Sequence, residues 1–295
     1  MQVDLLFLPA RVYTNEEEDS AMHPRYSIHF ILIVAVVLLV QSLDAAPLAD
    51  DQLSREQQEE FLLHAKVIRS RKTGEGKTNP YRLTLSDGNI EHDASFQTVF
   101  VRENYRVFED GTTEMNYVDS YLYNIAAYRL ARMLGLEDMM PVTVERKCLG
   151  EMGSLSWWLS VQMNERERTE KNIDPPDLLA HNKQKHKMRV FSELVYDSDR
   201  NDTNVLIGEN WELYMIDFSR AFRLYRDLKD ARNLEYCDRD LFSKLQQLDQ
   251  DAVLKETKGF LTKDEVKAVM ARRDLIVGIF KKMIEEKGEG AVLYD

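Results

Sequence analysis

The chain reads Asp197-Ser-Asp-Arg-Asn-Asp-Thr-Asn-Val-Leu-Ile-Gly-Glu-Asn-Trp-Glu-Leu-Tyr-Met-Ile-Asp-Phe-Ser-Arg-Ala-Phe-Arg223 in the stretch that decides its fold. This stretch is a polar loop followed by two short apolar runs, the second of which ends in an acidic residue. The runs 205–207 and 213–216 predict two strands that a turn at 208–210 joins into a hairpin. Asn204 and Asp217 then lie at strand ends, where a rigid support fixes their short side chains.

The spacing of three polar residues in this stretch is typical of a phosphoryl-transfer site. Asn204 follows Asp199 by five residues, and Asp217 follows it by eighteen. In such a site one carboxylate orients the attacking hydroxyl, while an amide oxygen and a second carboxylate hold Mg²⁺ against the phosphates. We therefore predict Asp199 as a catalytic residue and Asn204 and Asp217 as metal ligands.

Two structural interpretations compete with this prediction. The stretch from Asp197 begins like a calcium-binding EF-hand loop, but Asp202 stands where that loop needs glycine, and Gly208 stands where it needs glutamate. The other interpretation is an ordinary turn, rich in Asp and Asn, before a hairpin. The spacing to the second acidic residue favours the phosphoryl-transfer site.

Residues 196–222 resemble the catalytic segment of the atypical kinases that include the HipA-like kinases, the phosphatidylinositol kinases and the secretory-pathway casein kinases. Those families carry a D-R-x-x-x-N loop and a later I-D-x-x-x-A-F segment. The matching residues are Asp199, Arg200, Asn204, Ile216, Asp217, Ala221 and Phe222. The resemblance implies that Arg200 belongs to the catalytic residues. Ser219 replaces the glycine that many protein kinases have after Asp-Phe, which argues against a movable activation-loop switch.

The resemblance implies an α+β, two-lobed protein-kinase-like fold, with ATP and Mg²⁺ as cofactors. We expect a polar lead-in at 47–60, a strand-rich nucleotide-binding lobe at 61–165, and a helical lobe at 166–295 that carries the catalytic loop. Fold resemblance does not identify the substrate, which is a protein, a lipid or a small molecule.

The expected nucleotide lobe departs from the family pattern at two positions. The family has a phosphate-binding lysine on one strand and a glutamate that pairs with it on the next helix. The matching residues here, which the resemblance assigns to the cofactor site, are Gln97 in the expected strand 92–100 and Asn124 in the expected helix 119–134. Two amides can still hydrogen-bond to each other, but they supply no positive charge to the phosphates. This departure makes a pseudokinase, a regulatory or nucleotide-binding module, the alternative to an active enzyme.

A glycine-bearing turn lies between two expected strands near the start of this lobe. Gly74 and Gly76 would let backbone N–H groups approach phosphates, so we assign both to the cofactor site. A plain hairpin loop explains the pair equally well. Lys77, in the same turn, is an unsupported substitute for the missing lysine.

The segment 1–46 has the layout of an N-terminal extension followed by a secretory signal that starts at Met22. A positively charged start at 22–25 precedes an uninterrupted apolar run at 30–40 and small residues after it. The run is shorter than the ~20 residues that span a bilayer. We expect export to a periplasm or the cell exterior, with cleavage near 45–48. The alternatives are a buried element of the folded domain and an uncleaved membrane anchor at 28–40.

Composition limits the partners and the disulfide chemistry. The formal net charge is −12, and basic residues are scattered among acidic ones, which argues against a nucleic-acid partner. Cys148 and Cys237 are the only cysteines and fall in different expected lobes, so we expect two separate thiols. A third hypothesis, beside the enzyme and the pseudokinase, is an exported structural domain that binds no nucleotide.

The remaining segments predict mostly helices. Residues 104–116 are interpreted as a polar insert, and the charged stretch 165–177 as a linker. A helix at 178–196 precedes Asp199, and the His and Lys cluster at 181–187 is interpreted as its solvated face. Further helices are expected from Ser54, at 238–248, at 249–258 and from Thr262.

Overall fold

The computed structural model describes residues 53–74 and 80–295. These residues belong to one compact unit, Pro47–Asp295. The expected export signal, and Gly76 and Lys77 of the glycine turn, lie outside the described residues.

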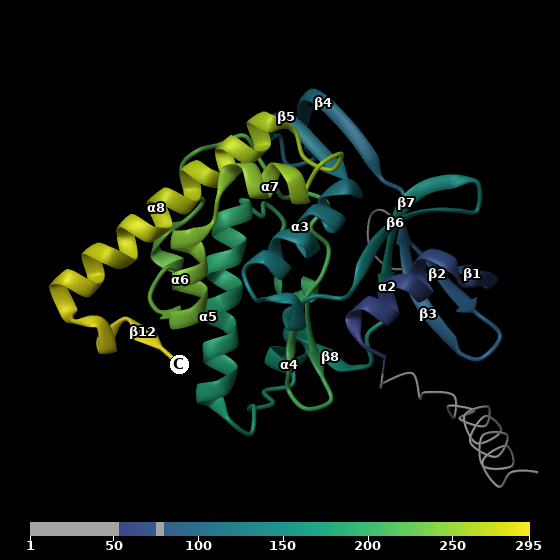
Figure 1. Cartoon of the computed structure of the whole chain (residues 1–295), viewed down its shortest axis with the longest axis horizontal. Helices are drawn as coiled ribbons and strands as arrows, with labels where there is room; N and C mark the ends of the chain where they lie inside the picture. Colours follow the sequence, from purple (N-terminus) through teal and green to yellow (C-terminus); the bar gives the residue numbers. More distant parts are fainter. Residues whose placement is uncertain (1–52, 75–79) are drawn as a thin grey trace, which may run out of the picture. The chain divides into compact units, whose positions relative to one another are not determined.

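The N-terminal part of the unit is built around a five-stranded antiparallel sheet (Figure 1). Its strands, in spatial order, are β1 (Lys66–Lys72), β2 (Tyr81–Ser86), β3 (Glu91–Gln97), β7 (Glu151–Trp157) and β6 (Thr143–Cys148). Every second side chain is buried along the middle strands, at Leu83 and Leu85 on β2 and at Ala94 and Phe96 on β3. This alternation directs one face of the sheet toward a core.

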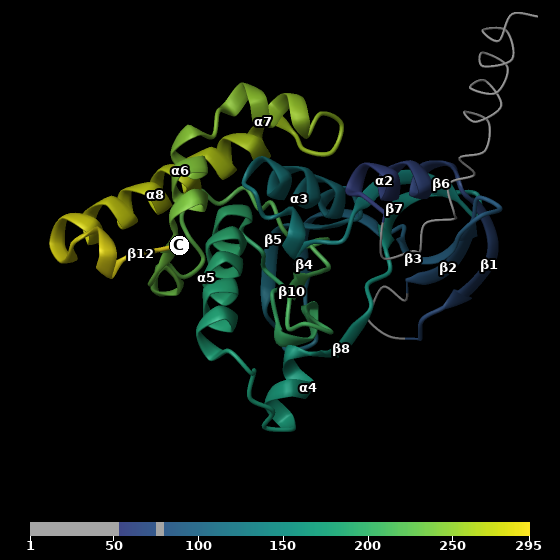
Figure 2. The ribbon, with the colours of Figure 1, turned by 60° about the horizontal axis from the view of Figure 1, so that its bottom comes forward.

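Helices α2 (Arg55–His64) and α3 (Leu122–Met133) pack against β6 and β7 (Figure 2). Ser54 and Gln57 form the predicted capping box of α2. α3 begins at Leu122 rather than at Asp119, because strand β5 continues through Ser120. Gly135 follows the helix with a φ of 68°, the left-handed conformation that ends many helices.

The stretch 104–116 is part of a long hairpin, which corrects its interpretation as a polar insert. β4 (Phe100–Val107) pairs with β5 (Thr113–Ser120) as a separate two-stranded sheet. Most side chains of the two strands are exposed or half-buried, so they show no period-two alternation of polar and apolar residues. The pattern that predicts a strand is therefore weak in this segment.

The C-terminal part combines a small sheet with most of the helices. β10 (Leu213–Met215), β9 (Val205–Gly208) and β8 (Val161–Asn164) form a three-stranded antiparallel sheet in that order. The helices are α4 (Glu165–Glu170), α5 (Leu178–Val195), α6 (Arg239–Gln247), α7 (Gln250–Glu256) and α8 (Lys263–Lys287), with single turns at Asp202–Asn204, Ala231–Asn233 and Glu289–Ala291. A further single turn, Glu137–Met139, lies between α3 and β6. β11 (Cys237–Asp238) pairs in parallel with β12 (Leu293–Tyr294). The predicted β9–β10 hairpin and the helices predicted in this part are confirmed.

The expected linker 165–177 begins with helix α4, whose first residue is buried. Glu165 accepts hydrogen bonds from Arg168 at 2.7 Å and Lys185 at 2.9 Å, and it lies 3.7 Å from the ring of His181. Burial acts to raise the pKa of Glu165, but the hydrogen bonds from the two cations outweigh it and lower the pKa to about 2. The interpretation of a solvated face on α5 is therefore wrong at His181, which is buried, and at Lys185, which is paired.

Both cysteines are free and buried, as expected for two separate thiols. Burial raises the pKa of Cys148, and it raises the pKa of Cys237 to about 12. Across residues 53–74 and 80–295, no helix has the length and apolar character needed to cross a membrane.

Candidate active site

The side chain of Arg200 connects several parts of the predicted catalytic loop through an ion pair and hydrogen bonds. Its guanidinium lies 2.6 Å from the buried carboxylate of Asp197. It also donates hydrogen bonds to the carbonyl oxygens of Asn204 at 2.6 Å and Ile216 at 2.9 Å, and lies 4.4 Å from the ring centroid of Phe218. One side chain thus joins the loop after α5 to the beginning of β9 and the end of β10. These contacts show that Arg200 positions the loop; the catalytic role that the resemblance implies stays a prediction.

Asp199, Asn204 and Asp217 come together at one end of the β9–β10 hairpin. The side-chain amide of Asn204 donates to the carbonyl oxygen of Asp199 at 3.2 Å. The carbonyl oxygen of Asn204 accepts the N–H of Ile216 at 3.1 Å, and Asp217 is the next residue along the chain. Asp199 is exposed on this loop. The structure therefore gathers the three residues that the sequence spacing singled out.

Asp217 occupies an unusual backbone conformation and a poorly solvated place. Its φ is 55°, in the left-handed region that costs free energy for residues other than glycine. Burial raises the pKa of its carboxyl group, and the nearby charge of Asp119 acts in the same direction. Hydrogen bonding to Ser219 and the charge of Arg200 oppose this shift. A bound divalent cation would favour the ionised carboxylate, because opposite charges lower the pKa of an acid.

The amides of Gln97 and Asn124 meet, as the sequence predicts. Asn124 donates its amide hydrogens to Oε1 of Gln97 at 2.6 Å and to Oγ of Ser154 at 3.3 Å. Its Oδ1 accepts the backbone N–H of Phe218 at 2.7 Å. A single buried side chain on α3 therefore joins β3, β7 and the segment that follows Asp217. The bridge is neutral, so it supplies no charge to a phosphate.

The β4–β5 hairpin is attached to the same segment. The N–H of Ser120 donates to the carbonyl oxygen of Ser219 at 2.8 Å. Glu114, also on β5, forms ion pairs with both Arg220 and Arg223. Arg223 is buried, so this carboxylate compensates a charge that would otherwise be unpaired in a poorly solvated place. The hairpin thus holds the chain after the predicted metal ligand in position.

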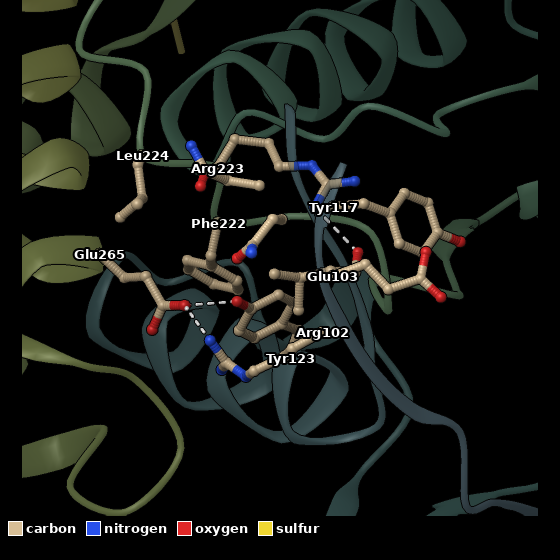
Figure 3. A pocket seen from close by; sticks show the side chains of 11 residues that line it. Arg102, Glu103, Tyr117, Tyr123, Phe222, Arg223, Leu224 and Glu265 are labelled. Atoms are coloured by element: carbon tan, nitrogen blue, oxygen red, sulfur yellow. Dashed lines mark hydrogen bonds and ion pairs between the residues drawn. The ribbon is translucent and has the colours of Figure 1, made fainter. Parts of the chain in front are cut away.

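A pocket of about 230 Å³ lies where this hairpin meets α3 and α8 (Figure 3). Its walls include Arg102, Tyr123, Phe222 and Glu265. Glu265 accepts hydrogen bonds from Tyr123 and, at 3.4 Å, from Arg102, as the dashed lines in Figure 3 mark. The pocket is lined by none of the predicted catalytic or metal-binding residues, so it is distinct from the candidate active site.

The donor atoms at the hairpin end suit a hard divalent cation. Mg²⁺ prefers oxygen ligands and usually takes only one or two carboxylates from the protein, together with phosphate oxygens and water. Asn204 and Asp217 supply one amide oxygen and one carboxylate. In the part of the chain that the structure describes, no group of three or more His, Cys, Asp or Glu residues is placed to hold a metal ion. The residues thus fit a cation shared with a phosphate ligand rather than a closed protein cage.

Sequence reasoning missed two residues that support this site. Asp197 entered only as the start of a rejected calcium loop, although its carboxylate balances Arg200. Glu114 lies in the hairpin that was interpreted as an insert. Neither position carries a motif of its own, because an isolated acidic residue in a polar segment gives no signal for a partner distant in the sequence.

Comparison with solved structures shows the fold of atypical, secretory-pathway kinases. The structure of hydra Fam20 with sugar matches with a TM-score of 0.59 and 15% sequence identity, covering 83% of this chain and 93% of that one. The Golgi casein kinase matches with a TM-score of 0.59 and 15% identity, covering 83% of this chain and 78% of that one. Its structure with Mn/ADP bound gives 0.58 and 14%, covering 83% and 79%. No protein-family model and no curated protein matches the chain.

At these identities the likeness shows the fold alone. It confirms the predicted α+β, two-lobed kinase-like fold and the resemblance to the atypical kinases. The roles of individual residues stay predictions.

Proposed function

We propose that this chain is a phosphotransferase that uses ATP and a divalent cation, Mg²⁺ or Mn²⁺. The observation that carries the proposal is the convergence of Asp199, Asn204 and Asp217 at one end of the β9–β10 hairpin within a kinase-like fold. The Golgi casein kinase, which shares the fold, has a structure with Mn/ADP bound.

Each residue has a separate role in this proposal. Asp199, exposed on its loop, orients the attacking hydroxyl group and accepts its proton. Asn204 and Asp217 bind the cation through their side-chain oxygens. When bound, the cation neutralises negative charge on the transferred phosphoryl group. Arg200 holds the two ligand-bearing strand ends together through their carbonyl oxygens.

A pseudokinase is the second candidate, and the hydrogen bond between Gln97 and Asn124 favours it. Two neutral amides stand where the resembling families have a lysine and a glutamate, so this point of the lobe delivers no positive charge to the phosphates. In that case the chain binds a nucleotide, or regulates a partner, without transferring phosphate.

A thermal-shift titration with ATP, with and without Mg²⁺ or Mn²⁺, tests nucleotide binding first. A ligand at one hundred times its Kd stabilises the folded state by about 2.7 kcal/mol. For a domain of this size each kcal/mol raises the Tm by about 2–4 °C, so a rise of roughly 5–11 °C is expected. Asp217→Asn should lose the cation-dependent part of the rise. Glu109→Gln, exposed in the β4–β5 turn, is the matched control and should behave like the parent chain.

Turnover then separates the two candidates. For an enzyme, Asp199→Asn should keep nucleotide binding but lose about 100-fold or more of the rate of ADP formation, the usual contribution of a general base. Nucleotide binding by a parent chain that forms no ADP with a range of acceptors would establish the pseudokinase. A parent chain whose Tm responds to no nucleotide would contradict both candidates and leave the structural domain.

We further propose that the chain is exported and acts on a hydroxyl group of a protein, a lipid or a small molecule. The layout of 1–46 supports export, and the resemblance supports lobes at 61–165 and 166–295, with Gly74 and Gly76 near the phosphates. Amino-terminal sequencing of the native protein tests export. A start near 45–48 is expected, whereas a start at Met1 or Met22 would contradict it.

A further inference from the structure

Asp119, near the end of β5, has a buried carboxylate oxygen without a partner. Its Oδ1 is shielded from solvent and accepts no hydrogen bond from the residues that the structure describes. Its Oδ2 accepts one long hydrogen bond, 3.4 Å from the hydroxyl of Tyr117. Buried polar atoms in folded proteins are nearly always satisfied, and a carboxylate oxygen without a donor is costly unless a ligand balances it.

Backbone contacts bring the end of β5, next to Asp119, to the segment that follows Asp217. Ser120, the next residue of β5, donates its N–H to the carbonyl oxygen of Ser219 at 2.8 Å. The N–H of Ser219 in turn donates to Oδ1 of Asp217 at 3.4 Å. Two consecutive hydrogen bonds, through Ser219, therefore connect the backbone of Ser120, next to Asp119, with the carboxylate of Asp217.

The side chain of Asp119 lies on the face of the hairpin that packs against this segment. Asp119 and Tyr117 are two residues apart on one strand, so they share a face. The ring of Tyr117 is buried, and its centroid lies 5.0 Å from the guanidinium of Arg220 and 5.6 Å from that of Arg223. The face that carries Asp119 is thus turned toward the chain that follows Asp217.

Asn124, the other amide near this place, is already engaged in three hydrogen bonds. Its two amide hydrogens and its oxygen are already bonded to Gln97, Ser154 and Phe218. In the catalytic segment, the side chain of Asp197 is paired with Arg200, and the proposed metal ligands are Asn204 and Asp217. A second carboxylate can come from another element, and Asp119 is an acidic residue on the strand that contacts the segment after Asp217.

We propose that Asp119 is a third protein ligand of the divalent cation, beside Asn204 and Asp217; the proposal rests on the proposed function. Two carboxylates and one amide oxygen match the charge and the oxygen preference of Mg²⁺ or Mn²⁺. The other coordination positions are left to phosphate oxygens and water. The β4–β5 hairpin, which precedes the catalytic segment by about a hundred residues, then completes the site.

Mn²⁺ binding tests this assignment directly. Free Mn²⁺ gives an electron paramagnetic resonance signal that falls as the ion binds, so its affinity can be measured in the presence of ADP without any turnover. Asp119→Asn keeps the size of the side chain and removes its charge. It should weaken Mn²⁺ binding tenfold or more, as Asp217→Asn should, while Glu109→Gln in the same hairpin should leave it unchanged.

Thermal stability gives a second readout, whose sign depends on the metal. In EDTA, Asp119→Asn should melt at a higher temperature than the parent chain, because two neighbouring carboxylates no longer repel each other. When saturating Mn²⁺ and ADP are added, the melting temperature of Asp119→Asn should rise by less than that of the parent chain. A merely structural role for Asp119 would instead lower the melting temperature under both conditions, and that result would overturn the proposal.

The outcomes distinguish this proposal from the proposed function. If Asp119→Asn binds Mn²⁺ as tightly as the parent chain while Asp217→Asn does not, the assignment of Asp119 is overturned and the metal site stands. If the parent chain binds no Mn²⁺ in the presence of ADP, both the assignment and the metal-dependent function are overturned.

Discussion

Asn124→Ala should destabilise the folded protein by about 3 kcal/mol, because one side chain makes three hydrogen bonds between separate parts of the structure. The largest cost comes from Phe218. Its backbone N–H is buried, and without the Asn124 oxygen it has lost its acceptor. A buried donor left without an acceptor costs about 1–3 kcal/mol.

The loss of the other two hydrogen bonds lowers the free energy of unfolding by a smaller amount. Each contributes about 0.5–1.5 kcal/mol, and the bond to Gln97 lies at the low end because that side chain is only half-buried and can turn toward water. Together the three terms give about 3 kcal/mol. Since each kcal/mol changes the Tm by about 2–4 °C for a domain of this size, the expected loss is roughly 6–12 °C.

Urea unfolding followed by tryptophan fluorescence measures the difference, and Gln97→Ala is the matched control. It removes the same 2.6 Å hydrogen bond but leaves Asn124 as the acceptor for Phe218, so it should cost only about 1 kcal/mol. Equal losses for the two variants would refute the reasoning, because the cost could not then come from the stranded N–H of Phe218.

Three further predictions concern other parts of the molecule. Arg200→Met should cost about 3–5 kcal/mol in urea unfolding, because it leaves the carboxylate of Asp197 buried without its cation; a loss below 1 kcal/mol would contradict this. The folded-state pKa of Glu165, about 2, lies below the ordinary 4.5, so its ionised form contributes stability above pH 4.5 that is lost as the pH falls toward 2. That contribution is about 3 kcal/mol, and Glu165→Gln should flatten the pH dependence of urea unfolding in this range. Finally, a thiol reagent at pH 8 should label neither Cys148 nor Cys237 in the folded protein and both in urea, since both are buried and burial raises their pKa; rapid labelling of a folded thiol would contradict this.

Local sequence signals predicted the elements around the catalytic loop correctly. The apolar runs on both sides of Gly208 form the β9–β10 hairpin, and Ser54 and Thr262 each begin a helix through a capping box. These features depend on residues a few positions apart, so the sequence displays them directly. The amide pair of Gln97 and Asn124 was also foreseen, although only through the resemblance to a family.

Features that depend on burial were predicted less well. The hairpin of β4 and β5 has mostly exposed or half-buried side chains, so its strands lack the alternation that would reveal them. His181 looked solvated among lysines, yet it packs beside Glu165 in the interior. In these cases the structure depends on a contact with a residue of another element, and the local sequence does not show that contact.

The spacing of Asp199, Asn204 and Asp217 can be read from the sequence, because all three lie on one loop and the hairpin that follows it. Which other residues meet them depends on how the chain folds. It places Asn124 against Phe218 and the β5 strand of Asp119 against Ser219, across about a hundred residues of chain in each case. Such contacts form when elements that are distant in the sequence pack together, so neither residue periodicity nor motif spacing predicts them.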